Sequence, residues 1–184
     1  MRGYARIAQH GKPVGALAAL RRPALAALVL GVAIAAAGTG HVPPRLVMST
    51  TLGWAPVILL QVAVALAVIG PPARGGVGVP RALDLFFAAQ GPWSIWLLAV
   101  AAWAVVATPP GQPVRFVQET AVIPLAWTAR LVYAFHVQVL GFSRGAAWRR
   151  TFVHQSMTIG AAVVVAGNSI FPRVVGLWHR WFAA

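Results

Sequence analysis

The sequence predicts an all-α integral membrane protein with about five transmembrane or strongly tilted membrane helices. Of its 184 residues, 59% are hydrophobic and 9% are charged, whereas a soluble domain carries about 25% charged residues. The mean hydropathy is +0.76. The apolar runs are continuous rather than alternating in polarity, a pattern that favours helices over membrane strands. This length suits a single membrane domain over residues 1–184.

Five apolar runs supply the expected helices, since a spanning helix needs roughly 20 apolar residues. In chain order they are Ala24–Gly38, Leu52–Gly70, Phe86–Thr108, Val117–Phe142 and Thr151–Phe171. The first run is short, and residues 14–20 either lengthen it or lie flat at the membrane surface. Segments rich in proline and glycine separate the runs, as is typical of loops between helices.

The first 23 residues are basic and contain no acidic residue. This composition suits either a mitochondrial presequence or a segment at the membrane interface, including an interfacial N-terminal helix. We therefore divide the chain into a basic N-terminal segment (1–23), N-terminal helices (24–110) and a final helix pair (113–184). With five spans, most arginine-rich loops fall on the side of the N-terminus, so the positive-inside rule places that end inside.

Charge and motif content limit the function classes. The chain carries 15 lysines and arginines against two acids, Asp84 and Glu119, for a net charge of +13. Its arginines are scattered through short loops, which favours anionic lipids such as cardiolipin and acidic neighbouring subunits as partners over nucleic acid. No phosphate-binding loop, zinc motif, serine-nucleophile motif or cysteine occurs. We therefore expect no catalysis by the chain alone, no cofactor and no metal.

Arg130 lies in the middle of the apolar run from Glu119 to Phe142. A charge at the centre of a bilayer costs roughly 2.5–3.5 kcal/mol on insertion scales, and chains that keep one commonly use it in a pathway, a relay or as a counter-ion. The structural alternative is an arginine that faces the bundle interior and binds backbone carbonyls. Glu119 precedes Arg130 by eleven residues, which puts both on one helix face about 16 Å apart. Glu119 would otherwise be an acid that stabilises a helix N-terminus.

Further polar residues occur in or near the last two runs. Histidine relays protons near neutral pH, and amides form hydrogen bonds between membrane helices. His136 and His154 lie on different predicted helices and could ligate a haem together, although no spacing supports that use. The candidates for a polar path are His136, Gln138, Gln155 and Asn168.

The motif around Arg130 carries a resemblance. Pro124-Leu125-Ala126 stands six residues before Arg130-Leu131. This spacing resembles subunit a of the F-type ATP synthases, the proton-channel stator subunit, in which a proline, often followed by Leu-Ala, precedes an essential arginine. Glu119-Thr120 resembles a pair in the mitochondrial members. Ala134 departs from the family, which usually carries asparagine there.

The resemblance implies that the final helix pair forms half-channels against the c-ring of the Fo sector. Arg130 would face the mid-membrane carboxylate of a c subunit, and the path would include Glu119, His136, Gln138, Gln155 and Asn168. The c-ring and other Fo and stator subunits would be partners, and protons the cargo. The location would be the mitochondrial inner membrane, or alternatively a bacterial plasma membrane or thylakoid.

Two alternatives from other classes remain open. The chain could be a non-catalytic accessory subunit of a respiratory or photosynthetic complex, in which Arg130 pairs with an acid or lipid phosphate of a neighbour. It could also be a stand-alone five-span protein of the Yip type, which the segments Leu83–Phe87 and Trp93–Leu98 faintly resemble. The group that faces Arg130 discriminates among the three.

Overall fold

The computed structural model describes residues 14–70, 77–107 and 119–167, and in this part of the chain every regular element is a helix. The all-α prediction is therefore confirmed. The helices are α2 (Ala16–Ala19), α3 (Arg21–Thr39), α4 (Pro44–Ile69), α5 (Val79–Ala88), α6 (Gly91–Ala107), α8 (Val122–Gln138) and α9 (Arg144–Gly167).

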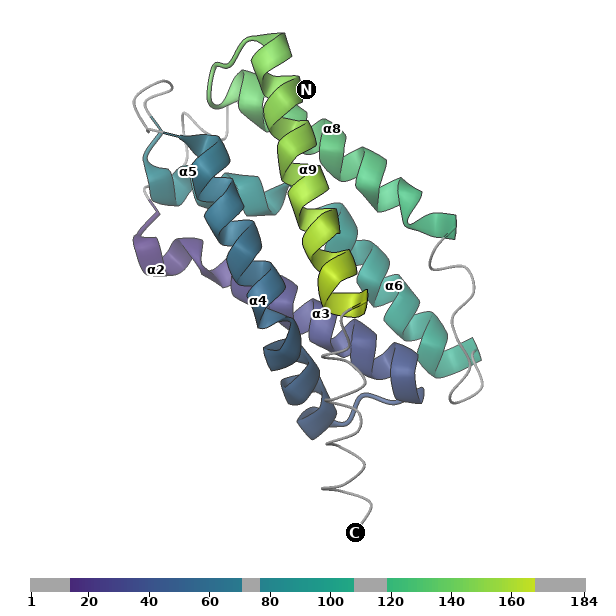
Figure 1. The fold of residues 1–184 in the computed structure, drawn as a ribbon. Coiled ribbons are helices and arrows are strands. Elements are labelled where there is room, and N and C mark those ends of the chain that lie inside the picture. Colours follow the sequence, from purple (N-terminus) through teal and green to yellow (C-terminus); the bar gives the residue numbers. More distant parts are fainter. Residues whose placement is uncertain (1–13, 71–76, 108–118, 168–184) are drawn as a thin grey trace.

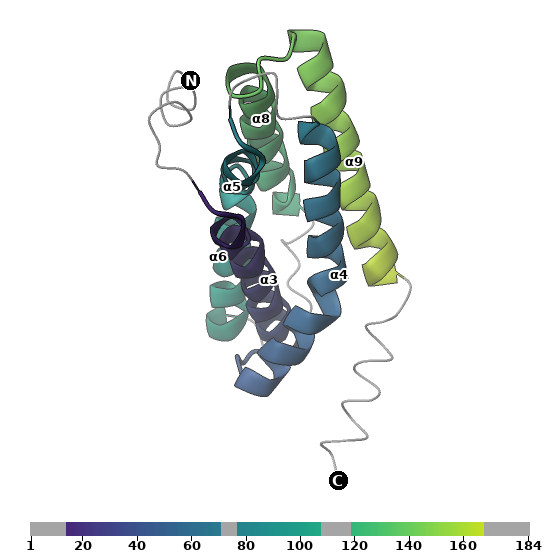
Figure 2. The ribbon, with the colours of Figure 1, turned by 90° about the vertical axis from the view of Figure 1, so that its left-hand side faces the viewer.

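The long helices form a closed circuit. Helix α3 packs on α4, α4 on α9, α9 on α8, α8 on α6, and α6 returns to α3. Seen from the side, α4 and α9 lie together in one layer, and α3, α6 and α8 form the other (Figure 2). The short helix α5 contacts α2, α3, α4 and α8 near one end of the bundle (Figure 1). Helices α8 and α9 thus share one bundle with the N-terminal helices.

Proline and glycine mark both ends of α4 and the end of α3. Helix α4 begins at Pro44, eight residues before the predicted start at Leu52, and the missing backbone donor of this proline removes no helical hydrogen bond. Helix α3 is closed by Gly40 and α4 by Gly70, both with a φ of 69°. Residues other than glycine rarely adopt this left-handed backbone conformation. These glycines therefore let the chain turn directly after each helix.

Two described helical segments are long and apolar enough to cross a membrane, Ala16–Thr39 and Pro44–Ile69. A third is counted if α5 and α6, which meet at an angle of 41°, form one bent span. The five predicted spans are therefore confirmed only as two or three candidates. Helix α8 has 17 residues, and the first two turns of α9 carry three arginines, Arg144, Arg149 and Arg150.

Several helix bounds differ from the predicted runs. Helix α2 and helix α3 extend the short first run back to Ala16, so residues 16–20 lengthen it rather than lie apart from it. The third run is broken near Gln90, because the chain turns there between α5 and α6. Helix α8 begins at Val122 rather than Val117, and α9 begins at Arg144 rather than Thr151. Residues 1–13 of the expected N-terminal segment lie outside the described residues.

Phe86 of α5 lies at the centre of the main apolar core. Its ring meets Phe87, Phe135 and His154 edge-on, with ring centroids 5.8, 5.8 and 4.7 Å away. Edge-to-face aromatic pairs add about 0.5–1.5 kcal/mol beyond their buried area. The ring of Phe86 therefore joins α5 to both α8 and α9. An ion pair also holds α5, since Arg22 Nε at the start of α3 lies 2.7 Å from the Asp84 carboxylate.

Helices α3 and α4 approach each other closely at Gly31. The hydroxyl of Thr50 donates a hydrogen bond of 2.9 Å to the carbonyl of Gly31. A Cβ at position 31 would lie 2.9 Å from the backbone nitrogen of Thr51 and would also collide with the Thr51 hydroxyl. Small residues permit such close packing between membrane helices.

Gly31→Ala should therefore separate α3 from α4 and lower the free energy of unfolding by about 1–3 kcal/mol. The measurement is unfolding in mixed detergent micelles, followed by the helical circular dichroism signal. Gly38→Ala on the same helix is the control, because a Cβ there meets nothing within 4 Å. Equal stabilities of the two variants would contradict the close approach.

Candidate functional site

Arg130 lies on the outer face of α8. Its side chain is exposed, and in the described part of the chain no acidic group pairs with it. The neighbouring outward side chains are apolar, with Val122 and Ile123 each 60% exposed and Trp127 54% exposed. The structural alternative of an arginine buried among the chain's own carbonyls does not hold, so the charge is available to a partner.

The start of α8 differs from the expected continuous helix. Ala121 forms a turn between the helical residues Glu119-Thr120 and α8. Pro124 occupies the first turn of α8, where its missing donor breaks no helical hydrogen bond, and the interruption between Glu119 and Arg130 lies at Ala121. Glu119 is exposed. It is no contact partner of Arg130, as their spacing predicts.

The inner face of α8 is polar where it meets α9. His136 is fully buried, and its Nδ1 lies 3.2 Å from the hydroxyl of Thr151 on α9. Three residues further along α9, His154 is also fully buried. Its Nε2 lies 3.4 Å from the hydroxyl of Thr158, and its ring packs against Phe86. His136 thus lies away from the exposed face that carries Arg130.

We call the buried polar side chains of α8 and α9 the polar core: Thr128, His136, Thr151, His154 and Gln155. Four of them carry a side-chain atom without a hydrogen-bond partner, and Gln138 of α8 and Gln90 at the turn between α5 and α6 carry one each. The atoms are Thr128 Oγ1, His136 Nε2, His154 Nδ1, Gln155 Nε2, Gln138 Oε1 and Gln90 Nε2. Leaving such an atom unpaired costs about 1–3 kcal/mol, so the polar core is suited to internal water.

The two histidines of the polar core are not joined by further metal-ligating groups among the described residues. His136 and His154 come from different helices, and each has a ring nitrogen without a partner. Within residues 14–70, 77–107 and 119–167, however, no group of three or more histidines or acids gathers. Hydroxyl and amide groups supply the rest of the polar core, and these favour water or a transferred proton over a transition metal.

The structure separates the predicted site residues into two groups. His136 and Gln155 belong to the polar core, Gln138 borders it, and Glu119 and Arg130 lie on the exposed surface. Asn168 lies outside the described residues. Thr128 and Thr151 were missed by the sequence analysis, although Thr128 lies eight residues before His136 and about 80° from it around the helix. Tyr133 of α8 packs on Trp148 of α9, with ring centroids 5.0 Å apart.

Comparison of the chain with models of protein families, with curated proteins and with solved structures finds no match. The class of the protein therefore follows from the structure itself. It is a helical protein with apolar helices long enough to cross a membrane, a buried polar core and an exposed arginine.

Thr151→Val should lower the free energy of unfolding by about 1–3 kcal/mol, because it keeps the shape of the side chain and leaves His136 Nδ1 unpaired. Ser156→Ala on the exposed face of α9 is the control and should change the stability by about 0.5 kcal/mol or less. Detergent-micelle unfolding measures both. A Thr151→Val protein as stable as the control would show that the hydrogen bond does not hold the polar core.

Proposed function

We propose that the chain is a proton-translocating membrane subunit of the type of subunit a in F-type ATP synthases. The observation that carries the proposal is the exposure of Arg130 on an otherwise apolar face of α8. A charge in that setting needs a partner of opposite sign, and a c-ring carboxylate would supply one. The resemblance of Pro124-Leu125-Ala126 and Arg130-Leu131 to that family supports the same assignment.

The order of polar groups along the chain suits two half-channels. Glu119 precedes Arg130 by eleven residues, ahead of the turn at Ala121, and His136 follows Arg130 by six residues, a separation of roughly 9 Å along the axis of α8. Polar side chains thus occur both before and after Arg130 along the chain. In the proposed mechanism, Glu119 belongs to one path, and His136, Gln138 and Gln155 belong to the other. Asn168, the remaining candidate, follows α9 in the sequence.

Arginine suits the place between the two paths. Its guanidinium keeps its proton under all working conditions, so it carries no proton across the boundary. An opposite charge within about 4–6 Å favours the ionised form of a carboxyl group. Arg130 would therefore promote proton release from an arriving carboxyl group and block direct leakage between the paths. Each proton that crosses contributes about 2.3 kcal/mol per 100 mV.

The accessory-subunit hypothesis rests on the same face of α8. Val122, Ile123 and Trp127 surround the charge with exposed apolar area, which also suits a fixed neighbour. Arg130 would then form a permanent ion pair with an acid or a lipid phosphate. This function predicts a loss of assembly, rather than a loss of proton coupling, when the charge is removed.

Arg130→Ala should abolish ATP-driven proton pumping or open a passive proton leak in vesicles that contain the native complex. The physical reason is that the boundary between the two paths loses its fixed positive charge. Arg130→Lys should pump protons at a rate between those of Arg130→Ala and the native protein. Lysine keeps the positive charge but lacks the planar guanidinium group that binds a carboxylate through two hydrogen bonds. Pumping is measured by quenching of a pH-sensitive dye at equal content of assembled complex.

Arg144→Ala is the matched control, since Arg144 is also an exposed arginine but lies at the start of α9. It should leave pumping unchanged. Unchanged pumping in Arg130→Ala, with full assembly, would exclude the proton-translocating function. Disassembly of the complex by Arg130→Ala would favour the accessory subunit.

A further inference from the structure

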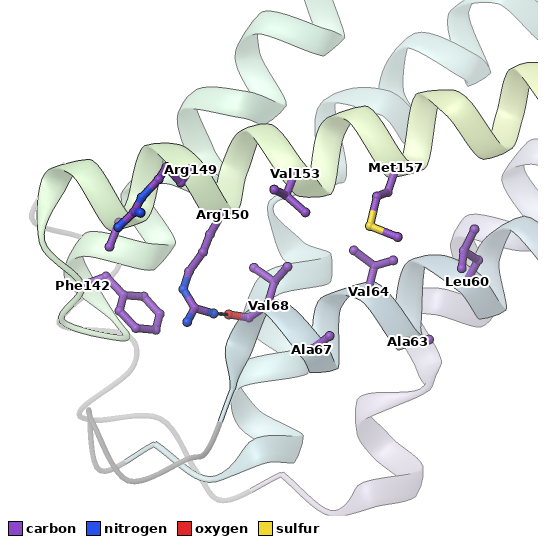
Figure 3. Close-up of a pocket in the computed structure, with 11 residues that line it drawn as sticks. Leu60, Ala63, Val64, Ala67, Val68, Phe142, Arg149, Arg150, Val153 and Met157 are labelled. Carbon is purple, nitrogen blue, oxygen red and sulfur yellow. Dashed lines mark hydrogen bonds between the residues drawn. The ribbon is translucent and has the colours of Figure 1, made fainter.

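A long apolar groove runs between α4 and α9. Its wider part has a volume of about 810 Å³, and α9 lines it with Arg149 and Arg150 at one end and Val153 and Met157 further along (Figure 3). A second hollow of about 360 Å³ continues it. The two share Leu60 and Met157 in their linings, so they form one groove.

Small side chains contribute to both walls of the groove. Ala63 and Ala67 of α4 and Ala146, Gly160 and Ala161 of α9 line it. From Arg149 to Val164 the lining follows α9 for fifteen residues, which is roughly 22 Å at 1.5 Å per residue. One leaflet of a bilayer has about 15 Å of hydrocarbon, half of the roughly 30 Å core. The groove can therefore hold an extended acyl chain along its length.

Two arginines occupy the end of the groove near the turn before α9. The guanidinium of Arg150 donates a hydrogen bond to the carbonyl of Val68 and lies 4.2 Å from the ring centroid of Phe142 (Figure 3). Both contacts hold it in place at the C-terminal end of α4. Arg149 beside it is exposed. No hydrogen bond within the described residues engages its guanidinium, which leaves its donors available to a ligand.

No acidic residue balances this charge. The groove lining contains no aspartate or glutamate, and neither does the whole of α9. Asp84 is engaged with Arg22 and Arg81. The groove thus combines a positive end with an apolar body, which is the complement of an anionic phospholipid. Basic pockets between membrane helices bind anionic lipid headgroups in this way.

We propose that the groove between α4 and α9 is a binding site for one anionic phospholipid. The phosphate lies against the guanidinium groups of Arg149 and Arg150, and an acyl chain follows α9 past Met157 to Val164. The bidentate geometry of arginine suits a phosphate. This site is independent of Arg130, which lies on α8, so lipid binding and proton coupling are tested separately.

The first experiment asks what occupies the groove. A photoreactive p-benzoylphenylalanine replaces Met157 in the full-length protein within membranes that contain equal amounts of phosphatidylglycerol and phosphatidylcholine. After irradiation, mass spectrometry identifies the adduct. The control position is Met48, which is exposed near the start of α4 and lines neither hollow. We expect adducts rich in phosphatidylglycerol at position 157 and the bulk lipid ratio at position 48.

The second experiment tests the two ends of the site. Arg149→Gln should lower the enrichment of phosphatidylglycerol at position 157 about fivefold, the equivalent of roughly 1 kcal/mol for one arginine near a lipid surface. Gly160→Leu should block the apolar end, where a Cβ meets nothing within 4 Å, and lower total lipid adducts. Arg144→Gln, which removes an exposed arginine outside the groove, should change neither quantity. Helical circular dichroism verifies that each variant is folded.

Three outcomes would overturn the proposal. The first is a ratio of phosphatidylglycerol to phosphatidylcholine adducts at position 157 that equals the ratio in the bulk membrane. The second is an enrichment of phosphatidylglycerol that Arg149→Gln leaves unchanged. The third is a peptide adduct, which would assign the groove to a second copy of the chain or to another part of the same chain.

Discussion

The contact of Phe86 with Phe135 and His154 is the interaction on which the rest of the structure depends. It brings a side chain of α5 between α8 and α9, which are the helices that carry both the polar core and Arg130. Truncation of a buried phenylalanine typically costs about 3–5 kcal/mol. The polar core therefore has an apolar wall on its α5 side, and its unpaired hydroxyl, amide and imidazole groups are kept away from lipid. A polar region in a membrane protein needs such a wall, because unsatisfied groups in hydrocarbon cost several kcal/mol each.

Helix α8 has two faces with different tasks. Its outer face is apolar except for Arg130, and its inner face carries the buried side chains of Thr128 and His136. A single helix thus separates an exposed charge from neutral polar groups directed into the bundle.

Much of the fold could be predicted from the composition and from the proline and glycine segments. The site could be predicted from the sequence only in part. The proline and glycine segments correctly predicted the turns after Thr39 and Ile69. The start of α9 was missed because Arg144, Arg149 and Arg150 read as loop charge, although their side chains reach the groove or solvent from a helix. The break near Gln90 was missed because the apolar run continues through it. Thr128 and Thr151 could not be recognised, since a threonine in an apolar helix shows its role only when its neighbour across the bundle is known.

The hydrogen bond that Trp96 Nε1 donates to the hydroxyl of Thr120, 2.9 Å long, joins α6 to the segment just before α8. Arg130 follows Thr120 by ten residues, across the turn at Ala121 and the first nine residues of α8. The position of the arginine along the bundle therefore depends on this anchor to α6. One residue inserted between Ala121 and Arg130 would advance the guanidinium by about 1.5 Å and turn it by about 100° toward the interior. The number of residues in this interval is thus as much a part of the site as the arginine itself.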